Sequence, residues 1–315
     1  MTANPTQYSD LFWALKGGGN SFGIVTRFDL LTYTSPTICA GIIEIPSTEK
    51  DLFLSAVANF GQYGSADAKA AVIPSIFMLG SLNITVYTSA LFYDGTNCTQ
   101  PALANFTAIP AIENTYGSTT LATYVEGTDA LIADGTRQAF RVVSSLATAE
   151  ALNIVHDTFV DMVTANIWDV AGLQASIAFQ PVTKNFIQQG INKGGNPQGV
   201  DISNAPYFCM FLAKSPYIDS NGLLGMVENF SWTDPADDAK IYAFAAQVTD
   251  IIEVKLLAAG QVAQYHYMND AGLGQEIFQN YGAGNLAKLQ SIRAKYDPLK
   301  VYTDLMPGGW KVDAA

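Results

Sequence analysis

Residues 9–29 constrain the fold most, because they read as a short helix, a glycine turn and a strand in direct succession. Ser9 suits the N-cap of a helix, and the three glycines at 17–19 end it. Residues 22–28 then alternate in the pattern of a β-strand. Such a glycine turn lets backbone lie against a planar or anionic ligand, but it also suits an ordinary turn. The order excludes a Rossmann nucleotide site, in which the glycines follow a strand and precede a helix.

A second set of motifs lies near the other end of the chain. Residues 267–270 read YMND, 280–282 read NYG, 295–298 read KYDP and 307–310 read PGGW. Together with DLFWALKGGGNSFGIVT at residues 10–26, this order resembles the FAD-linked oxidoreductases related to berberine bridge enzyme and vanillyl alcohol oxidase, the PCMH-type family. The fungal branch of that family is the nearest match.

The pattern of the middle of the chain predicts an α+β fold. Strand-like runs interleave with a few long amphipathic helices from residue 38 onward, which favours an antiparallel sheet covered by helices. The resemblance implies three parts: residues 1–35 as a remnant of a PCMH-type FAD-binding domain, 36–260 as the substrate domain, and 261–315 as a segment that returns to the FAD-binding domain.

The individual elements follow from periodicity, capping residues and turn residues. The predicted helices span residues 9–15, 47–63, 100–106, 148–167, 234–259 and 285–296. The predicted strands span residues 22–28, 38–45, 71–79, 82–92, 137–143, 172–182, 207–212, 224–232 and 261–269. Residues 112–127 and 185–200 are expected to be irregular.

The position of the glycine segment implies a missing front half. In the family it lies well inside the chain, after a flavin-binding region, whereas here it starts at residue 9. The strand at 22–28 has no obvious pairing partner in this sequence, which independently indicates a missing domain. We therefore expect a chain that lacks the N-terminal flavin-binding half and that alone binds FAD weakly or not at all.

Three polar side chains near the C-terminus are candidates for catalysis or binding. In a strand over residues 261–269, Tyr265, Tyr267 and Asn269 share one face, and His266 points to the opposite one. By resemblance, Tyr267 and Asn269 match the motif that lies against the flavin. A phenol there could act as a general base if its pKa is lowered, with Tyr267 the first candidate and Tyr265 the second. Equally, tyrosines often pack the ring inside and keep the hydroxyl wet.

The resemblance also assigns cofactor contacts to the glycine segment, where a side chain on a glycine would push FAD away. The positions that match are Gly18, Gly19, Asn20, Phe22, Gly23 and Ile24. The histidine that attaches FAD in the family precedes this segment. Neither His156 nor His266 can therefore take that role.

Composition and motif spacing exclude several other functions. A formal net charge of -12 argues against nucleic acid or an anionic membrane as a partner, and no apolar run is long enough to span a bilayer. No metal-binding or catalytic-triad pattern surrounds His156 or His266, so we expect no metal; His156 is expected to pack in a helix. The three cysteines have no metal-type spacing, and Cys39 and Cys209 are expected to be buried as small apolar residues.

Four sequons indicate a secreted, glycosylated ancestor. They begin at Asn83, Asn97, Asn105 and Asn229. The first residues show neither the basic nor the apolar region of a signal peptide.

Three hypotheses for function remain open at this point. The first is an FAD-dependent oxidoreductase that moves hydride from an alcohol, sugar or alkaloid-like substrate to the flavin. The second is a flavin-free pseudo-enzyme or binding scaffold that guides a cyclisation in the retained pocket. The third is an incomplete product, stable only with its missing half. The expected partners are a small molecule and either that half or a second copy of the chain.

Overall fold

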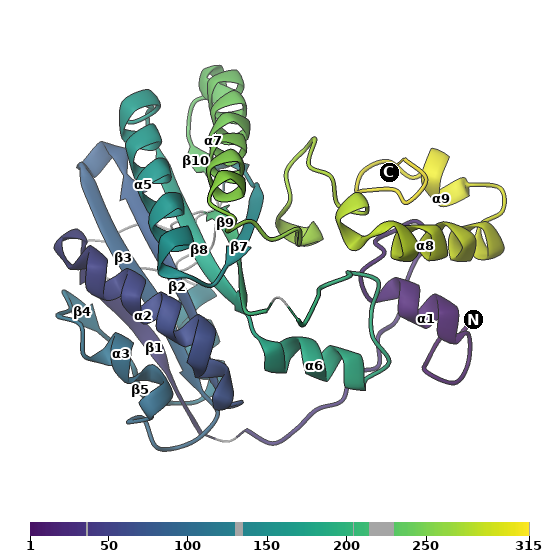
Figure 1. Cartoon of the computed structure of the whole chain (residues 1–315), viewed down its shortest axis with the longest axis horizontal. Helices are drawn as coiled ribbons and strands as arrows, with labels where there is room; N and C mark the ends of the chain where they lie inside the picture. The colour runs from purple at the N-terminus through teal and green to yellow at the C-terminus, as the bar shows by residue number, and fades with distance from the viewer. Residues whose placement is uncertain (36, 130–134, 204, 214–229, 315) are drawn as a thin grey trace.

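The sheet organises the molecule, with three long helices on one of its faces and a smaller helical part beside it (Figure 1). The computed structural model describes residues 1–35, 37–129, 135–203, 205–213 and 230–314. Both termini lie in the smaller helical part (Figure 1).

The sheet has ten strands, and every described pairing is antiparallel. Its long strands are β1 (Ile38–Pro46), β2 (Ala70–Leu79), β3 (Ile84–Tyr93) and β8 (Gln174–Val182). The shorter ones are β4 (Glu113–Asn114), β5 (Gly117–Thr119), β6 (Arg137–Ala139), β7 (Val142–Leu146), β9 (Tyr207–Ala213) and β10 (Phe230–Trp232). The order is β4-β1-β3-β2-β8-β10-β6, while β5 also pairs with β1, and β9 pairs with both β8 and β7.

Three amphipathic helices cover one face of the sheet: α2 (Lys50–Tyr63), α5 (Ala149–Asn166) and α7 (Asp238–Ala258) (Figure 1). The Thr148 side chain caps α5 by accepting a hydrogen bond from the Ala151 amide. The main core lies between these helices and the sheet, where Phe53 of α2 stacks on Tyr87 of β3 with ring centroids 4.6 Å apart. Burial of each such side chain contributes about 1.5–3 kcal/mol. The predicted α+β class, with helices covering an antiparallel sheet, is confirmed.

A second, smaller core lies on the other face of the sheet. It includes Val142 of β7, Ala178 of β8 and Cys209 of β9, and the partly buried Tyr265 and Tyr267 pack against it. Helix α6 (Lys184–Asn192) contributes the buried Ile187. This face therefore carries the residues on which the functional argument depends.

The smaller helical part joins the two ends of the chain. Helix α1 (Ser9–Leu15) packs against α8 (Ala283–Tyr296), and the short α9 (Val301–Asp304) follows (Figure 1). Asp10 accepts hydrogen bonds from Lys295 Nζ at 2.7 Å and from the Tyr296 hydroxyl at 2.8 Å. The Lys295 contact, with help from Tyr296, lowers the pKa of Asp10 to about 2. The two ends are thus fixed to each other by both packing and charge.

Two predicted strands are wrong. Residues 23–35 form neither helix nor strand, because no other part of the described chain pairs with them. Residues 261–269 make only one bridge, between Ser145 and Val262, and then turn into a 3-10 helix at Met268–Asp270. The predicted strand at 137–143 is interrupted and forms β6 and β7.

The two segments expected to be irregular contain regular structure. Residues 112–127 include β4, β5 and the start of α4 (Leu121–Asp129), and residues 185–200 include most of α6. The remaining short helix, α3 (Ala104–Thr107), lies where a helix was predicted. Residues 224–229 of a predicted strand lie outside the described residues, and β10 forms directly after them.

Cys39 and Cys98 form a disulfide, which the sequence analysis missed. Cys39 is fully buried in β1, as expected, but as half of a cross-link and not as a small apolar residue. Cys209 is buried in β9.

The connection from α1 to β1 exposes large apolar side chains. Ile24 is 68% exposed, Phe28 74% and Leu31 101%, and the segment runs extended below the rest of the chain (Figure 1). Such a row of apolar side chains on unpaired extended backbone is typical of a surface that another element covers. Among the described residues, no helix combines the length and apolar character needed to cross a membrane.

Candidate functional site

The glycine segment and the C-terminal motifs, about 250 residues apart in the sequence, lie against each other. The Tyr281 hydroxyl donates a hydrogen bond to the Gly17 carbonyl at 2.9 Å. Asn20 donates to the Gly308 carbonyl at 3.3 Å and accepts from Lys311 Nζ at 2.8 Å. The two sequence motifs that carry the resemblance are therefore parts of one structural unit.

Gly18 and Phe22 lie inside this unit. Phe22 is buried in a small core with Leu11 and Leu289. A Cβ on Gly18 would lie 2.5 Å from the Ala14 carbonyl oxygen and 2.6 Å from the Phe22 ring. Gly18 and Phe22 therefore pack inside the unit, beneath the glycine turn. Their predicted contact with FAD stays a prediction.

Gly19, Gly23 and Ile24 lie closer to the surface. Gly19 has a φ of +66° and packs beside the Met268 sulfur, where a Cβ would approach to 3.2 Å. A Cβ on Gly23 would meet nothing within 4 Å, and Ile24 is exposed. Together with Gly308, whose surroundings are equally open, these positions fit one wall of a flavin site, and the FAD contacts predicted for them remain predictions.

Tyr265 turns toward a cavity on the second face of the sheet. Its hydroxyl accepts a hydrogen bond from Gln198 Nε2 at 3.1 Å, and its backbone carbonyl accepts one from the Ser144 hydroxyl. Burial raises the pKa of Tyr265 well above its ordinary value. The phenol therefore remains protonated at neutral pH, which suits a hydrogen-bond donor better than the general base considered above.

Tyr267 and Asn269 form a pair of their own. Asn269 Nδ2 donates to the Tyr267 hydroxyl at 2.7 Å, so the side chains of the matched YxN motif do meet. Tyr267 is half-buried and Asn269 is exposed. The two tyrosine hydroxyls therefore have different hydrogen-bond partners, Gln198 for Tyr265 and Asn269 for Tyr267. The catalytic role of either tyrosine stays a prediction.

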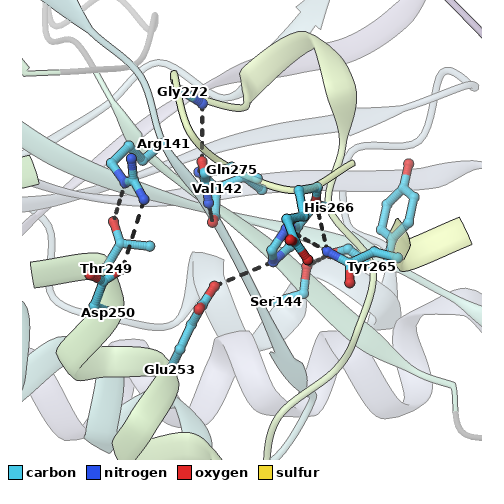
Figure 2. A network of polar contacts seen from close by, with 12 residues as sticks. Arg141, Val142, Ser144, Thr249, Asp250, Glu253, Tyr265, His266, Gly272 and Gln275 are labelled. Carbon is cyan, nitrogen blue, oxygen red and sulfur yellow. Dashed lines mark hydrogen bonds and ion pairs between the residues drawn. The ribbon is translucent and has the colours of Figure 1, made fainter. Parts of the chain in front are cut away.

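His266 points away from the side chain of Tyr265 (Figure 2). Its Nδ1 lies 3.1 Å from the Glu276 carbonyl oxygen, and its Nε2 lies 3.3 Å from a Glu253 carboxylate oxygen on α7. The prediction that His266 faces away from its neighbours is confirmed, although the backbone is not a strand. His266 therefore fastens the tyrosine-bearing segment to the helical layer.

A buried glutamine fastens the same segment to the sheet. Gln275 Oε1 accepts from the amides of Val142 and Gly272 at 2.9 and 3.0 Å, and Nε2 donates to the Val142 carbonyl at 2.6 Å (Figure 2). The side-chain amide thus pairs with the edge of β7 as a neighbouring strand would. The Trp310 indole also donates to the Gln275 carbonyl at 2.9 Å, which connects the PGGW motif to the sheet.

The cavity beside Tyr265 has a volume of about 310 Å³, within the range of small-molecule sites. Val182, Ile187 and Val200 supply apolar walls, and Gln198 and Tyr265 supply polar atoms. Gln198 and Gln275 were not predicted, because each lies in a segment without a motif. A polar residue in a glycine-rich loop would have been the only signal for Gln198.

His156 is not part of this site. It is 5% exposed in the main core, where Nε2 lies 2.8 Å from the Tyr87 hydroxyl and Nδ1 2.8 Å from Asp157. The predicted packing role is confirmed. Within the described part of the chain, no three His, Cys, Asp or Glu side chains are grouped to hold a metal ion.

Comparison with solved structures identifies the fold. The structure superposes on 6-hydroxy-D-nicotine oxidase from Arthrobacter nicotinovorans with a TM-score of 0.65 at 16% identity, covering 96% of this chain and 61% of that one. It superposes on BBE-like 1 from Physcomitrella patens with a TM-score of 0.60 at 14% identity, covering 96% and 60%. The fold is that of the vanillyl alcohol oxidase-type and berberine bridge enzyme-like flavoproteins.

Comparison of sequences finds relatives from fungi. The chain is 32% identical over 320 residues to the FAD-dependent monooxygenase prx3 of Penicillium roqueforti, covering 98% of this chain and 60% of that protein. The predicted resemblance to FAD-linked oxidoreductases is confirmed, and FAD is the cofactor in the relative's name. The chain spans about three fifths of the relative's length. No protein-family model matches it.

Proposed function

We propose that this chain forms the substrate-binding part of an FAD-dependent oxidoreductase, to which a further flavin-binding segment must be added. The main support for the proposal is that the glycine segment packs against the C-terminal motifs, with hydrogen bonds from Tyr281, Asn20 and Lys311 between them. The relatives' names support an oxidoreductase over a flavin-free scaffold. When bound, FAD would supply the electron acceptor for oxidation of the substrate.

The chain's own residues would bind and orient the substrate. Tyr265 presents a protonated hydroxyl to the cavity, while Asn269 orients the Tyr267 hydroxyl. His266, through Glu253 of α7, and Gln275, through Val142 of β7, fix the segment that bears both tyrosines. The walls of the cavity would exclude water from the bound molecule.

A fusion protein tests the proposal. The part of prx3 that the alignment leaves uncovered is joined to this chain, and flavin absorbance is measured after desalting. We expect the fusion to retain FAD, because the exposed residues 23–35 would then have a domain to pair with. A fusion that is folded by circular dichroism but colourless would contradict the proposal.

We also propose a secretory origin, supported by the disulfide and by the exposure of the sequon residues Asn83, Asn97 and Asn105. The fourth sequon residue, Asn229, lies outside the described residues. When the chain is secreted from yeast behind a heterologous signal peptide, treatment with an N-glycosidase is expected to lower its apparent mass. An unchanged mass would count against this origin.

A further inference from the structure

The direction of one hydrogen bond determines what the cavity beside Tyr265 can recognise. Gln198 Nε2 donates to the Tyr265 hydroxyl, so the oxygen of that hydroxyl accepts. The hydroxyl's own proton has no acceptor among the described residues. Burial keeps the phenol protonated, because it raises the pKa of Tyr265. The hydroxyl is therefore a donor that awaits an acceptor on a ligand.

The neighbouring tyrosine supports this assignment of the amide. A hydrogen bond from Gln198 also acts on Tyr281, where it opposes the effect of burial on that pKa. The Tyr281 hydroxyl already donates to the Gly17 carbonyl. Because the Tyr281 proton is already used, a Gln198 side chain that presents its NH₂ group to the two phenols agrees with the bond to Tyr265.

The remainder of the lining disfavours a cation. Among the residues that the structure describes, no aspartate or glutamate lines the cavity, although the chain as a whole carries a formal charge of -12. Lys193 is part of the lining, and Lys16 Nζ donates to the Lys193 carbonyl at 3.3 Å. An ammonium ligand would meet donors and positive charge but no carboxylate.

We infer that this cavity binds a largely apolar molecule through an oxygen that accepts a hydrogen bond from the Tyr265 hydroxyl, and that it disfavours amines. The inference rests on the proposed function, and among the alcohol, sugar and alkaloid-like substrates considered above it selects a carbonyl- or hydroxyl-bearing aromatic compound. Val182, Ile187 and Val200 would cover the ring, and Gln198 would fix the direction of the Tyr265 hydrogen bond. Tyr265 is a binding residue in this inference, and Gln198 is a positioning residue.

Two probes of equal size test the inference on the full chain without FAD. 2-Acetonaphthone carries an acceptor oxygen and no charge, whereas 2-naphthylmethylamine carries an ammonium group. Isothermal titration calorimetry is expected to show that the ketone binds at least about tenfold more tightly. Equal or tighter binding of the amine would overturn the inference without reference to any variant.

Two variants then examine the hydrogen bond itself. Tyr265→Phe is expected to weaken ketone binding about 5- to 10-fold and to leave the amine unchanged, because one hydrogen bond is lost. Gln198→Glu is expected to make the amine bind more tightly than the ketone. The new carboxylate accepts a hydrogen bond from the Tyr265 hydroxyl and attracts the ammonium group. Tyr242→Phe is the matched control, since Tyr242 lies on α7 and, within the described part of the chain, its hydroxyl donates one weak hydrogen bond, to the Gln138 carbonyl at 3.4 Å.

The outcome is independent of the flavin proposal. Unchanged ketone affinity in Tyr265→Phe, or an equal loss in Tyr242→Phe, would overturn the assignment of Tyr265 while leaving FAD binding by the fusion unaffected. A colourless fusion would contradict the flavin proposal while leaving the probe affinities as they are.

Discussion

Replacing Gln275 with alanine is expected to lower the free energy of unfolding by about 3 kcal/mol. The change removes three hydrogen bonds at once, and it leaves the amide and carbonyl of Val142 without partners at a buried position. An unsatisfied buried backbone group is more costly than the loss of an exposed hydrogen bond. Urea denaturation followed by circular dichroism measures the change.

Two further substitutions test whether the loss of stability comes from the unpaired Val142 backbone. Gln290→Ala removes one hydrogen bond, from Nε2 to the Val312 carbonyl at 3.0 Å, and should lower the free energy of unfolding by about 1 kcal/mol or less. Gln275→Glu keeps an acceptor for the Val142 amide, and at low pH its protonated carboxyl can still donate to the Val142 carbonyl, so its stability should then lie between wild type and Gln275→Ala. Stability should fall as the carboxyl ionises, because the donor is lost and a charge is buried. If Gln275→Ala and Gln290→Ala lowered the free energy of unfolding equally, the Gln275 side chain would not take the place of a strand beside β7.

Replacing Gly18 with alanine is expected to destabilise the protein by about 2–3 kcal/mol. The new methyl group would lie 2.5 Å from the Ala14 carbonyl oxygen, 2.6 Å from the Phe22 ring and 3.0 Å from Leu289. Because the first of these is backbone of α1, residue 18 would have to move away from the end of that helix. The same measurement of urea denaturation applies.

Gly284→Ala is the control for that substitution. Gly284 lies in the first turn of α8, has an ordinary backbone conformation, and offers open space to a Cβ. Alanine there should stabilise the protein by about 0.5–1 kcal/mol, since glycine loses more conformational freedom on folding. A loss of stability at Gly284, or none at Gly18, would show that the close packing around Gly18 is not what holds the glycine segment.

The sequence predicted those elements whose pattern is local. The helices α2, α5, α7 and α8 appear within a few residues of their predicted limits, because their apolar spacing and end residues are sufficient to define them. Helix α6 was missed because its sequence is mostly polar. The signal was present in Thr183, whose side chain accepts from the Phe186 amide and caps the helix.

The two wrong strands show what a local pattern omits. Residues 22–28 alternate as a strand does, but a strand also needs a neighbour, and the described chain provides none. Residues 261–269 have a possible neighbour in β7, but the Gln275 side chain occupies that edge. In the first case the described chain offers no neighbouring strand, and in the second the competing side chain lies outside the window of the pattern.

The candidate site was predicted in part. The resemblance identified the glycine segment and the tyrosines, and the structure shows that the first packs against the C-terminal motifs. The opposite orientations of Tyr265 and His266 were predicted, but the donor role of Tyr265 depends on Gln198, a residue 67 positions away. The Cys39–Cys98 disulfide likewise depends on the pairing of β1 with β3, which brings Cys39 opposite Tyr93, close in sequence to Cys98.

The visible absorption spectrum of the purified chain, recorded before and after addition of FAD and desalting, tests the central claim most directly. The claim is that Gly19, Gly23 and the segment around Met268 form only one wall of the flavin site. We therefore expect a colourless protein that releases added FAD on desalting. A flavin spectrum that survives desalting would contradict the claim, because these residues would then suffice to hold the cofactor.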